Sequence, residues 1–245
     1  MQKRCIPYLS SSVLLSEKEA DMKGSVIAIS GIDTGIGKTF VTGMLGKALL
    51  LQGKTIITQK IVQTGCEGVP EDVLEHRRLM GIELQDVDRK GFTAPYVFPY
   101  PASPHLAASI AGVEIDILHI RRATFALQKH YELILLEGVG GLLVPLTKDL
   151  LFADYIRDAG YELILVTSPR LGSINHTLLS IDACVRRGIV IRGIIYNCFL
   201  NSEKMITDDT REIIFRYLNK VGSAAPVIDL TEGMLEEGAL HRLRF

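Results

Sequence analysis

The sequence has no excess of charge of either sign. Its 27 lysines and arginines are balanced by 28 aspartates and glutamates, which leaves a formal net charge of −1. Nucleic-acid binding usually requires a clustered basic face, because contacts to phosphates supply much of the affinity. The charge balance therefore gives no indication of a nucleic-acid partner.

Long apolar runs and paired cysteines are also absent. The sequence contains no stretch of about 18 consecutive apolar residues, so it predicts no membrane-spanning helix and no membrane partner. The cysteines form neither a C-x-x-C pair nor a zinc-ligand spacing; they are Cys5, Cys66, Cys184 and Cys198. Because unpaired cysteines are typical of reducing compartments, we expect a cytoplasmic protein.

The composition that remains is that of a folded chain. Of the 245 residues, 47% are hydrophobic and 22% are charged, and no linker or low-complexity run divides them, so we expect one domain over residues 24–245. Residues 1–23 lack a clear signal-peptide core and cleavage site, and we expect a disordered extension there. A targeting segment, or a start codon assigned upstream of Met22, is the alternative.

Short apolar runs alternate with helical stretches along the rest of the chain. The predicted strands cover residues 26–30, 55–58, 132–136, 162–166 and 190–196. The predicted helices cover residues 38–52, 72–80, 115–129, 149–159, 173–187 and 207–220. Strands separated by helices form right-handed crossovers, so we predict an α/β fold with one mainly parallel sheet and helices on both faces. Ligands of such sheets bind beyond the carboxyl ends of the strands.

A glycine-rich loop follows the first predicted strand. Residues 31–39 read G-I-D-T-G-I-G-K-T and lead directly into a predicted helix. Backbone N–H groups of such a loop surround phosphate oxygens, Lys38 reaches the β- and γ-phosphates, and the Thr39 hydroxyl is an expected Mg²⁺ ligand. The strict pattern requires glycine at position 32, where this chain has Ile32. The match is a variant that predicts a P-loop NTPase-like fold, and a glycine-rich turn without a ligand is the alternative.

The second predicted strand leads to Lys60. A lysine at the carboxyl end of a strand in this sheet points toward the same crevice as the phosphate loop, although a solvated surface lysine is the alternative. Thr64 and Gly65 follow four and five residues later. They could supply a hydroxyl group and a closely approaching backbone to a polar substrate.

Two carboxylates are candidate magnesium ligands. Glu137 follows a buried strand and precedes the glycines Gly138, Gly140 and Gly141, which leave room for another molecule against the backbone. A carboxylate opposite a phosphate loop is where a second Mg²⁺ contact is expected, and a turn carboxylate that caps a helix is the alternative. Asp72 is either a third magnesium ligand or an ordinary residue of a first helical turn.

Two helix starts are weaker candidates. Ser103 and Pro104 have the residue types of an N-cap and a first helical position, and His105 is either a substrate ligand or a structural histidine. Residues 171–176, L-G-S-I-N-H, open another helix whose free N–H groups could hold a carboxylate, and a plain helix start is the alternative.

Taken in order, these segments resemble the dethiobiotin synthetase family. The resemblance covers roughly residues 24–197 and rests on G-I-D-T-G-I-G-K-T, K-I-V-Q-T-G, P-A-S-P-H-L-A-A, E-G-V-G-G-L-L-V-P-L, L-G-S-I-N-H and Asn197. Single motifs of this kind are common among P-loop proteins, whereas the ordered set is specific. The family's own loop has the displaced first glycine.

The resemblance implies an ATP-dependent ring closure in biotin biosynthesis. In the family, 7,8-diaminopelargonate takes up CO₂ as a carbamate, ATP phosphorylates the carbamate, and the second amine closes the ureido ring to give dethiobiotin, ADP and phosphate. Lys38 and Lys60 are then the expected catalytic residues. A homodimer is also implied, with the substrate's carboxylate tail bound across its interface.

The resemblance also assigns ligand contacts residue by residue. The implied nucleotide contacts are Thr34, Gly35, Ile36, Gly37, Lys38, Thr39, Phe40, Asp72, Glu137, Gly138, Val139, Gly140 and Asn197, with Asn197 at the adenine. The implied Mg²⁺ ligands are Thr39, Asp72 and Glu137. The implied substrate contacts are Thr64, Gly140, Ser173, Ile174 and Asn175.

The chain departs from the family at several positions. Gly35 stands where many members have glutamate, Ile61 replaces a frequent proline, and residues 226–230 do not match the family's late G-x-I-P stretch beside the adenine. A degenerate paralogue that binds nucleotide without turnover is therefore one alternative. A nucleotide-switch ATPase is another, but it needs a lysine where this chain has Asp33. A related amidoligase would need a glutaminase domain, for which the chain has no room.

Overall fold

The computed structural model describes residues 24–200 and 203–245, and its centre is a seven-stranded sheet. The strand order is β2-β5-β1-β6-β7-β8-β9. All neighbouring strands run parallel except the pair β8 and β9. The strands are β1 (Ser25–Gly31), β2 (Ile56–Lys60), β5 (Leu133–Gly141), β6 (Glu162–Thr167), β7 (Ile191–Asn197), β8 (Val227–Thr231) and β9 (Met234–Leu235).

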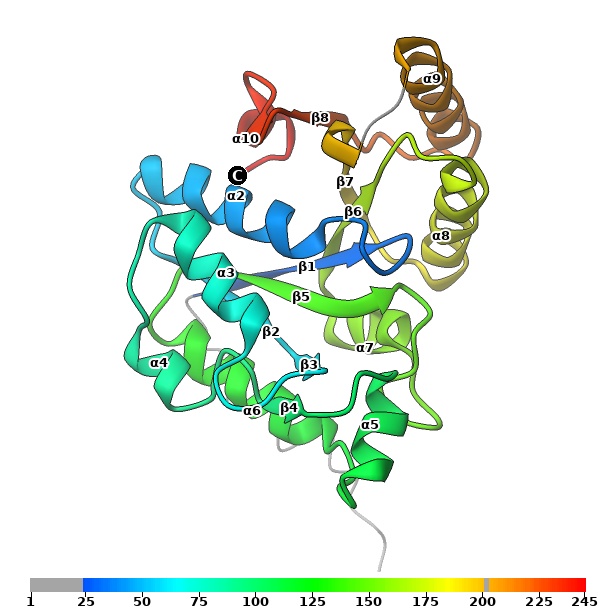
Figure 1. Cartoon of the computed structure of the whole chain (residues 1–245). Helices are drawn as coiled ribbons and strands as arrows, with labels where there is room; N and C mark the ends of the chain where they lie inside the picture. Colours follow the sequence, from blue (N-terminus) through cyan, green and yellow to red (C-terminus); the bar gives the residue numbers. More distant parts are fainter. Residues whose placement is uncertain (1–23, 201–202) are drawn as a thin grey trace, which may run out of the picture.

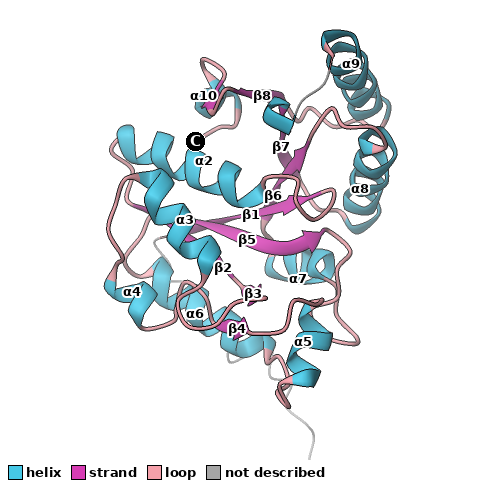
Figure 2. Cartoon of the chain, in the orientation of Figure 1, coloured by secondary structure: helices cyan, strands magenta, loops and turns pink. Residues whose placement is uncertain are grey.

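Helices cover both faces of this sheet. Figure 1 shows α2 and α3 over one face and α6 and α7 on the other, with α8 and α9 packed side by side; Figure 2 shows the same layers by element type. The α/β fold class is confirmed. The helices are α2 (Lys38–Leu51), α3 (Glu71–Met80), α4 (Asp86–Arg89), α5 (Pro104–Ile110), α6 (Ile117–Gln128), α7 (Phe152–Ala159), α8 (Ser173–Arg187), α9 (Lys204–Lys220), α10 (Ala239–Arg242) and the 3₁₀ turn η2 (Cys198–Leu200).

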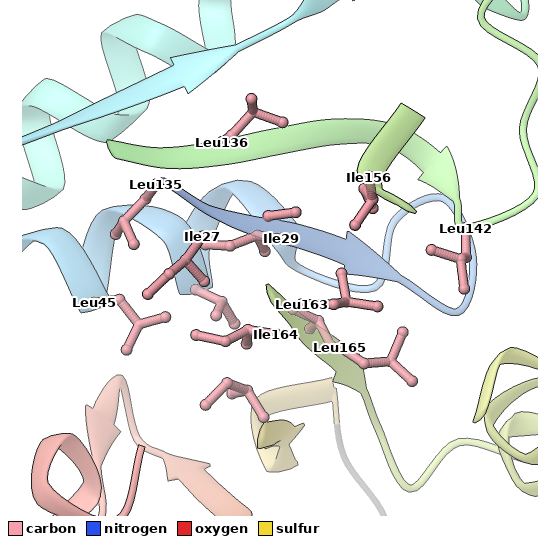
Figure 3. Close-up of a cluster of buried hydrophobic side chains, with 14 of the residues drawn as sticks. Ile27, Ile29, Leu45, Leu135, Leu136, Leu142, Ile156, Leu163, Ile164 and Leu165 are labelled. Carbon is pink, nitrogen blue, oxygen red and sulfur yellow. The ribbon is translucent and has the colours of Figure 1, made fainter. Parts of the chain in front are cut away.

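The central strands are continuous apolar runs because helices cover them on both faces. Strand β1 lies between β5 and β6, whose sequences both contain Leu-Ile-Leu. Figure 3 shows the side chains of these three strands together with Leu45 of α2 and Ile156 of α7, and the labelled residues are all buried. Burial of this core fixes the strand ends that carry the polar residues described below.

Several predicted boundaries were wrong. Strand β5 continues through the glycines to Gly141, α7 begins at Phe152 and α9 begins at Lys204. The short strands β3 (Val62–Thr64) and β4 (Tyr96–Phe98) were not predicted. They pair only with each other, across more than thirty residues of sequence, and three-residue strands carry too little periodicity to be recognised.

Helix α3 packs closely against α2 because glycine is present on α2. A Cβ atom at Gly43 would lie 2.7 Å from Leu79 Cδ1, so a larger residue there would push the helices apart. Arg77 on α3 also donates two hydrogen bonds to Asp88 of α4, at 2.9 and 2.7 Å, and both side chains are buried. These contacts set the position of α3 above the end of β2.

Within residues 24–200 and 203–245, no helix combines the length and apolar character needed to cross a bilayer. The extension expected over residues 1–23 lies outside the described residues, as does Cys5.

Candidate active site

The carboxyl ends of β1, β2 and β5 meet at one cavity of about 880 Å³. Lys60 and Glu137 are direct partners in the parallel pairing of β2 with β5, so both strands deliver a charged side chain at the same level. The cavity brings together most of the predicted site residues. Those that line it are Thr34, Gly35, Gly37, Lys38, Thr39, Phe40, Lys60, Thr64, Asp72, Glu137, Val139 and Gly140.

The glycine-rich loop has the backbone geometry of a phosphate cradle. Gly37 has φ of +92° and occupies the N-cap of α2, a left-handed conformation that favours glycine. A Cβ atom there would also lie 2.4 Å from Asn197 Nδ2. Since α2 has no side-chain cap, the N–H groups of its first turn remain free to bind an anion.

Lys38 is folded back inside this loop. Its side-chain amine donates a 3.0 Å hydrogen bond to the carbonyl oxygen of Asp33. Burial, with a further contribution from the charge of Lys60, lowers the pKa of Lys38 to about 8. Because the Lys38 amine is largely shielded from water, phosphate oxygens bound in the loop would interact strongly with its positive charge.

Asp33 is held by its own contacts. It accepts a 2.7 Å hydrogen bond from the Thr34 N–H and pairs with the Arg170 guanidinium from the loop after β6. The Thr34 hydrogen bond and the Arg170 side chain together hold the pKa of Asp33 below its ordinary value. The pair joins the phosphate loop to the segment that leads into α8.

Lys60 lies at the centre of a buried charge cluster. Its Nζ atom is 2.7 Å from Glu137 Oε1, 2.8 Å from Asp72 Oδ2 and 3.0 Å from the carbonyl oxygen of Gly138. Burial alone would lower the pKa of Lys60, but the two carboxylates outweigh it and raise the pKa above its ordinary value. Lys60 is therefore a positively charged group at the cavity wall.

Glu137 is completely buried and ionised. Burial alone would raise its pKa, but the charge of Lys60 and a 2.8 Å hydrogen bond between His76 Nε2 and Glu137 Oε2 hold the pKa well below its usual range. His76 was not singled out in the sequence. A lone histidine on a helix gives no signal of this contact until α3 is placed over the sheet.

The Thr39 hydroxyl lies next to the two carboxylates of this cluster, so that three oxygen groups able to bind a metal are close together. The Thr39 hydroxyl lies 2.9 Å from Asp72 Oδ1 and 3.2 Å from Glu137 Oε1. Among the described residues, no group of three or more His, Cys, Asp and Glu side chains forms a metal cage. A hydroxyl with two carboxylates instead fits Mg²⁺, which keeps several waters and shares phosphate oxygens.

A second hollow of about 570 Å³ lies beside the phosphate loop. The rings of Phe40 and Phe199 stack there, with centroids 6.1 Å apart and planes inclined by 21°. Cys198 and residues 231–233 complete the wall. Phe199 and residues 231–233 were missed in the sequence, because they come together only through the packing of the segments after β7 and β8.

Other predicted residues lie outside the main cavity. Asn197 is buried, and its Nδ2 donates to the Ile36 carbonyl oxygen at 3.1 Å while its Oδ1 accepts from the Phe199 N–H at 3.2 Å. Gly138 contributes its carbonyl oxygen to Lys60. Ser173, Ile174 and Asn175 form the first turn of α8 and do not line the cavity.

The two candidate helix starts have the predicted form. Ser103 is the N-cap of α5 and Pro104 its first residue, although the Ser103 side chain makes no capping hydrogen bond. Both line the main cavity, whereas His105 lines a separate one. The roles assigned to all these residues stay predictions.

The fold and the sequence of this chain are similar to those of known proteins. A family model described as an AAA domain matches residues 25–228. A solved structure of a ParA family ATPase from Chlorobium tepidum has a TM-score of 0.50 at 14% identity and covers 90% of this chain and 89% of its own. At that identity the likeness concerns the fold alone.

Two curated relatives are much more similar in sequence. The ATP-dependent dethiobiotin synthetase BioD of Chlorobaculum tepidum is 61% identical over 233 residues, which are 94% of this chain and 98% of that protein. ATP-dependent dethiobiotin synthetase BioD 2 of Pasteurella multocida is 46% identical over 195 residues, or 80% and 92% of the two chains. Identity at this level over most of each chain means that the chain belongs to the dethiobiotin synthetase family.

Proposed function

We propose that this protein is an ATP-dependent dethiobiotin synthetase acting on 7,8-diaminopelargonate and CO₂. The observation that carries the proposal is the cluster of Lys60, Asp72 and Glu137 beside the phosphate loop, in one cavity with Lys38 and Thr39. Phosphoryl transfer depends mainly on positioning and on neutralising charge. The cavity supplies two lysines, Lys38 and Lys60, and an oxygen-rich metal site for that purpose.

The proposed reaction has three steps. One amine of the substrate adds to CO₂ and loses a proton, which gives a carbamate. A carbamate oxygen then attacks the γ-phosphorus of ATP and ADP leaves, which gives a carbamoyl phosphate. The second amine attacks the carbonyl carbon, phosphate leaves, the amine loses its proton, and the ureido ring of dethiobiotin is closed.

The chain's own side chains have distinct tasks in this scheme. Lys38, at the start of α2, binds the β- and γ-phosphate oxygens. Lys60 faces the same cavity and stabilises the negative charge of the carbamate and of the transferring phosphoryl group. Thr39, Asp72 and Glu137 would hold Mg²⁺, which when bound neutralises charge on the β- and γ-phosphates.

The proposal includes the rest of the predicted contacts. Thr64 and Gly140 line the cavity where the diamine would bind. The first turn of α8 lies outside it, so the substrate's carboxylate tail would reach residues 173–175 of a second copy in a homodimer. The nucleobase would bind near Asn197, in the hollow lined by Phe40 and Phe199. The cytoplasmic location is part of the same proposal.

The test is phosphate release from ATP with Mg²⁺ and bicarbonate, with and without the diamine, together with product analysis by mass spectrometry. We expect release that depends on the diamine and a product with the mass of dethiobiotin. Release without the diamine would instead indicate a switch ATPase or another acceptor. ATP binding with no release in either case would indicate a degenerate paralogue and contradict the proposal.

A further inference from the structure

His76 connects α3 to the Glu137 carboxylate of β5. It lies one helical turn after Asp72, and its imidazole has no exposed surface. Its Nε2 atom is 2.8 Å from Oε2 of Glu137, a side chain that is also fully buried. A buried polar pair of this kind is costly to break, because each partner then loses its compensation for leaving water.

The two oxygens of Glu137 have different partners. Oε2 accepts from His76, while Oε1 faces Lys60 at 2.7 Å and Thr39 at 3.2 Å. An ionised carboxylate can only accept hydrogen bonds, so Nε2 of His76 must carry the hydrogen. The bond fixes the carboxylate plane and thereby directs Oε1 into the cavity.

The imidazole makes no second hydrogen bond that would explain its burial. Within the described residues, His76 Nδ1 is buried and has no partner. If the side chain at this position only filled the core, an apolar residue would serve better, because burying an unpaired polar atom such as Nδ1 costs free energy. The contact with Glu137 is the feature that requires a donor at this position.

We propose that His76 is a positioning residue for the magnesium–phosphate site: it orients Glu137 so that Oε1 joins the oxygens of Thr39 and Asp72. The inference rests on the proposed function, because it concerns the metal site of that reaction. Because Asp72 and His76 lie on the same helix, α3 sets the position of one carboxylate directly and of the other through the imidazole. Residues that hydrogen-bond metal-ligating carboxylates typically change metal affinity or activity about 10–100-fold when replaced.

Two substitutions separate positioning from packing. The side-chain amide of His76→Gln can place a donor close to Nε2, whereas His76→Leu fills the space without one. Each variant is titrated with Mg²⁺ in the presence of a non-hydrolysable ATP analogue, with binding measured by calorimetry. The same analogue is then titrated with EDTA present. His130→Leu, at an exposed position, is the matched control.

We expect His76→Leu to weaken Mg²⁺ binding about 10–100-fold while binding of the metal-free analogue changes little. His76→Gln should restore most of the affinity. Equal Mg²⁺ affinity in a folded His76→Leu variant would overturn the proposal, as would a loss in His76→Gln as large as that in His76→Leu.

A measurement on the unmodified protein covers the case in which the leucine variant does not fold. In ¹⁵N-histidine-labelled protein, the buried Nε2–H of His76 should give a slowly exchanging signal that shifts when Mg²⁺ and the ATP analogue are added together. A signal unaffected by Mg²⁺ would contradict the inference. The proposed function is tested by a different result: it would be contradicted if the wild-type protein formed no dethiobiotin, whatever the Mg²⁺ titrations show.

Discussion

Lys60 and Glu137 face each other across the paired strands β2 and β5, with Nζ 2.7 Å from Oε1 and both side chains buried. The parallel register makes them direct neighbours, so the ion pair is a consequence of strand pairing rather than of loop conformation. Asp72 joins the pair from α3 at 2.8 Å. The site thus has a cation held between two carboxylates.

Replacement of Lys60 by glutamine should separate nucleotide binding from turnover. The phosphate loop is left intact in Lys60→Gln, so ATP binding measured by calorimetry should persist. The charge that stabilises the carbamate and phosphoryl group is lost, so turnover should fall about 100-fold or more. Lys54→Gln, a half-exposed lysine near the other end of β2, is the control. Unchanged turnover in Lys60→Gln would remove Lys60 from the mechanism.

The lowered pKa of Lys38 predicts a pH dependence of stability. Lys38 has a pKa of about 8 in the folded chain against an ordinary value of 10.5, so the unfolded chain binds more protons between these pH values. The contribution of Lys38 to the free energy of unfolding must then rise with pH in that window, because the cost of its buried charge disappears. Below the window, Lys38 is protonated in both states and the cost is fully present.

The measurement is urea unfolding of wild type and Lys38→Met at about pH 7.5 and about pH 9.5. Burial raises the pKa of Tyr155 and raises that of Cys184 to about 12, and both groups lower stability as the pH rises. Tyr155 and Cys184 are present in both proteins, so their effects cancel when the free energy of unfolding of Lys38→Met is subtracted from that of the wild type. The remaining pH dependence belongs to Lys38. A difference that is the same at both pH values would contradict the lowered pKa.

The aromatic hollow predicts a role for Phe199 in nucleotide affinity. Base stacking on an aromatic side chain contributes about 1–3 kcal/mol, so Phe199→Ala should weaken ATP binding about tenfold. Binding of inorganic triphosphate should not change, because it does not reach the hollow. Phe215→Ala, at an exposed phenylalanine of α9, is the control. Equal loss for ATP and triphosphate would mean that the substitution disturbs the phosphate loop instead.

Much of this site could be predicted from the sequence because its residues lie at or just beyond the carboxyl ends of apolar strand segments. Lys60 and Glu137 end the apolar parts of β2 and β5, and Lys38 follows the glycine-rich loop after β1. Parallel strands deliver such residues to one edge of the sheet. His76 and Phe199 could not be found in this way. The role of His76 depends on how α3 packs over the sheet, and that of Phe199 on how the segment after β7 packs. The spacing of apolar residues along the sequence does not reveal either arrangement.

The most demanding structural test concerns the bond that holds α3 in place. Asp88 accepts two hydrogen bonds from Arg77 and others from the Thr93 hydroxyl and the Gln85 N–H, at 2.6 and 2.7 Å. Burial alone would raise the pKa of Asp88, but Arg77 outweighs it and holds the pKa below its ordinary value. The carboxylate therefore contributes stability above its ordinary pKa, and the contribution is lost as the pH falls through the folded value.

Asp88→Ala should lower the free energy of unfolding by about 3–5 kcal/mol at neutral pH, because it leaves the Arg77 guanidinium buried without its counter-charge. Urea unfolding followed by circular dichroism measures this change. Asp86→Ala, a neighbour whose side chain is 83% exposed, should change stability by less than about 1 kcal/mol. If both variants were equally stable, Arg77 and Asp88 would not anchor α3, and the positions of Asp72 and His76 would need another support.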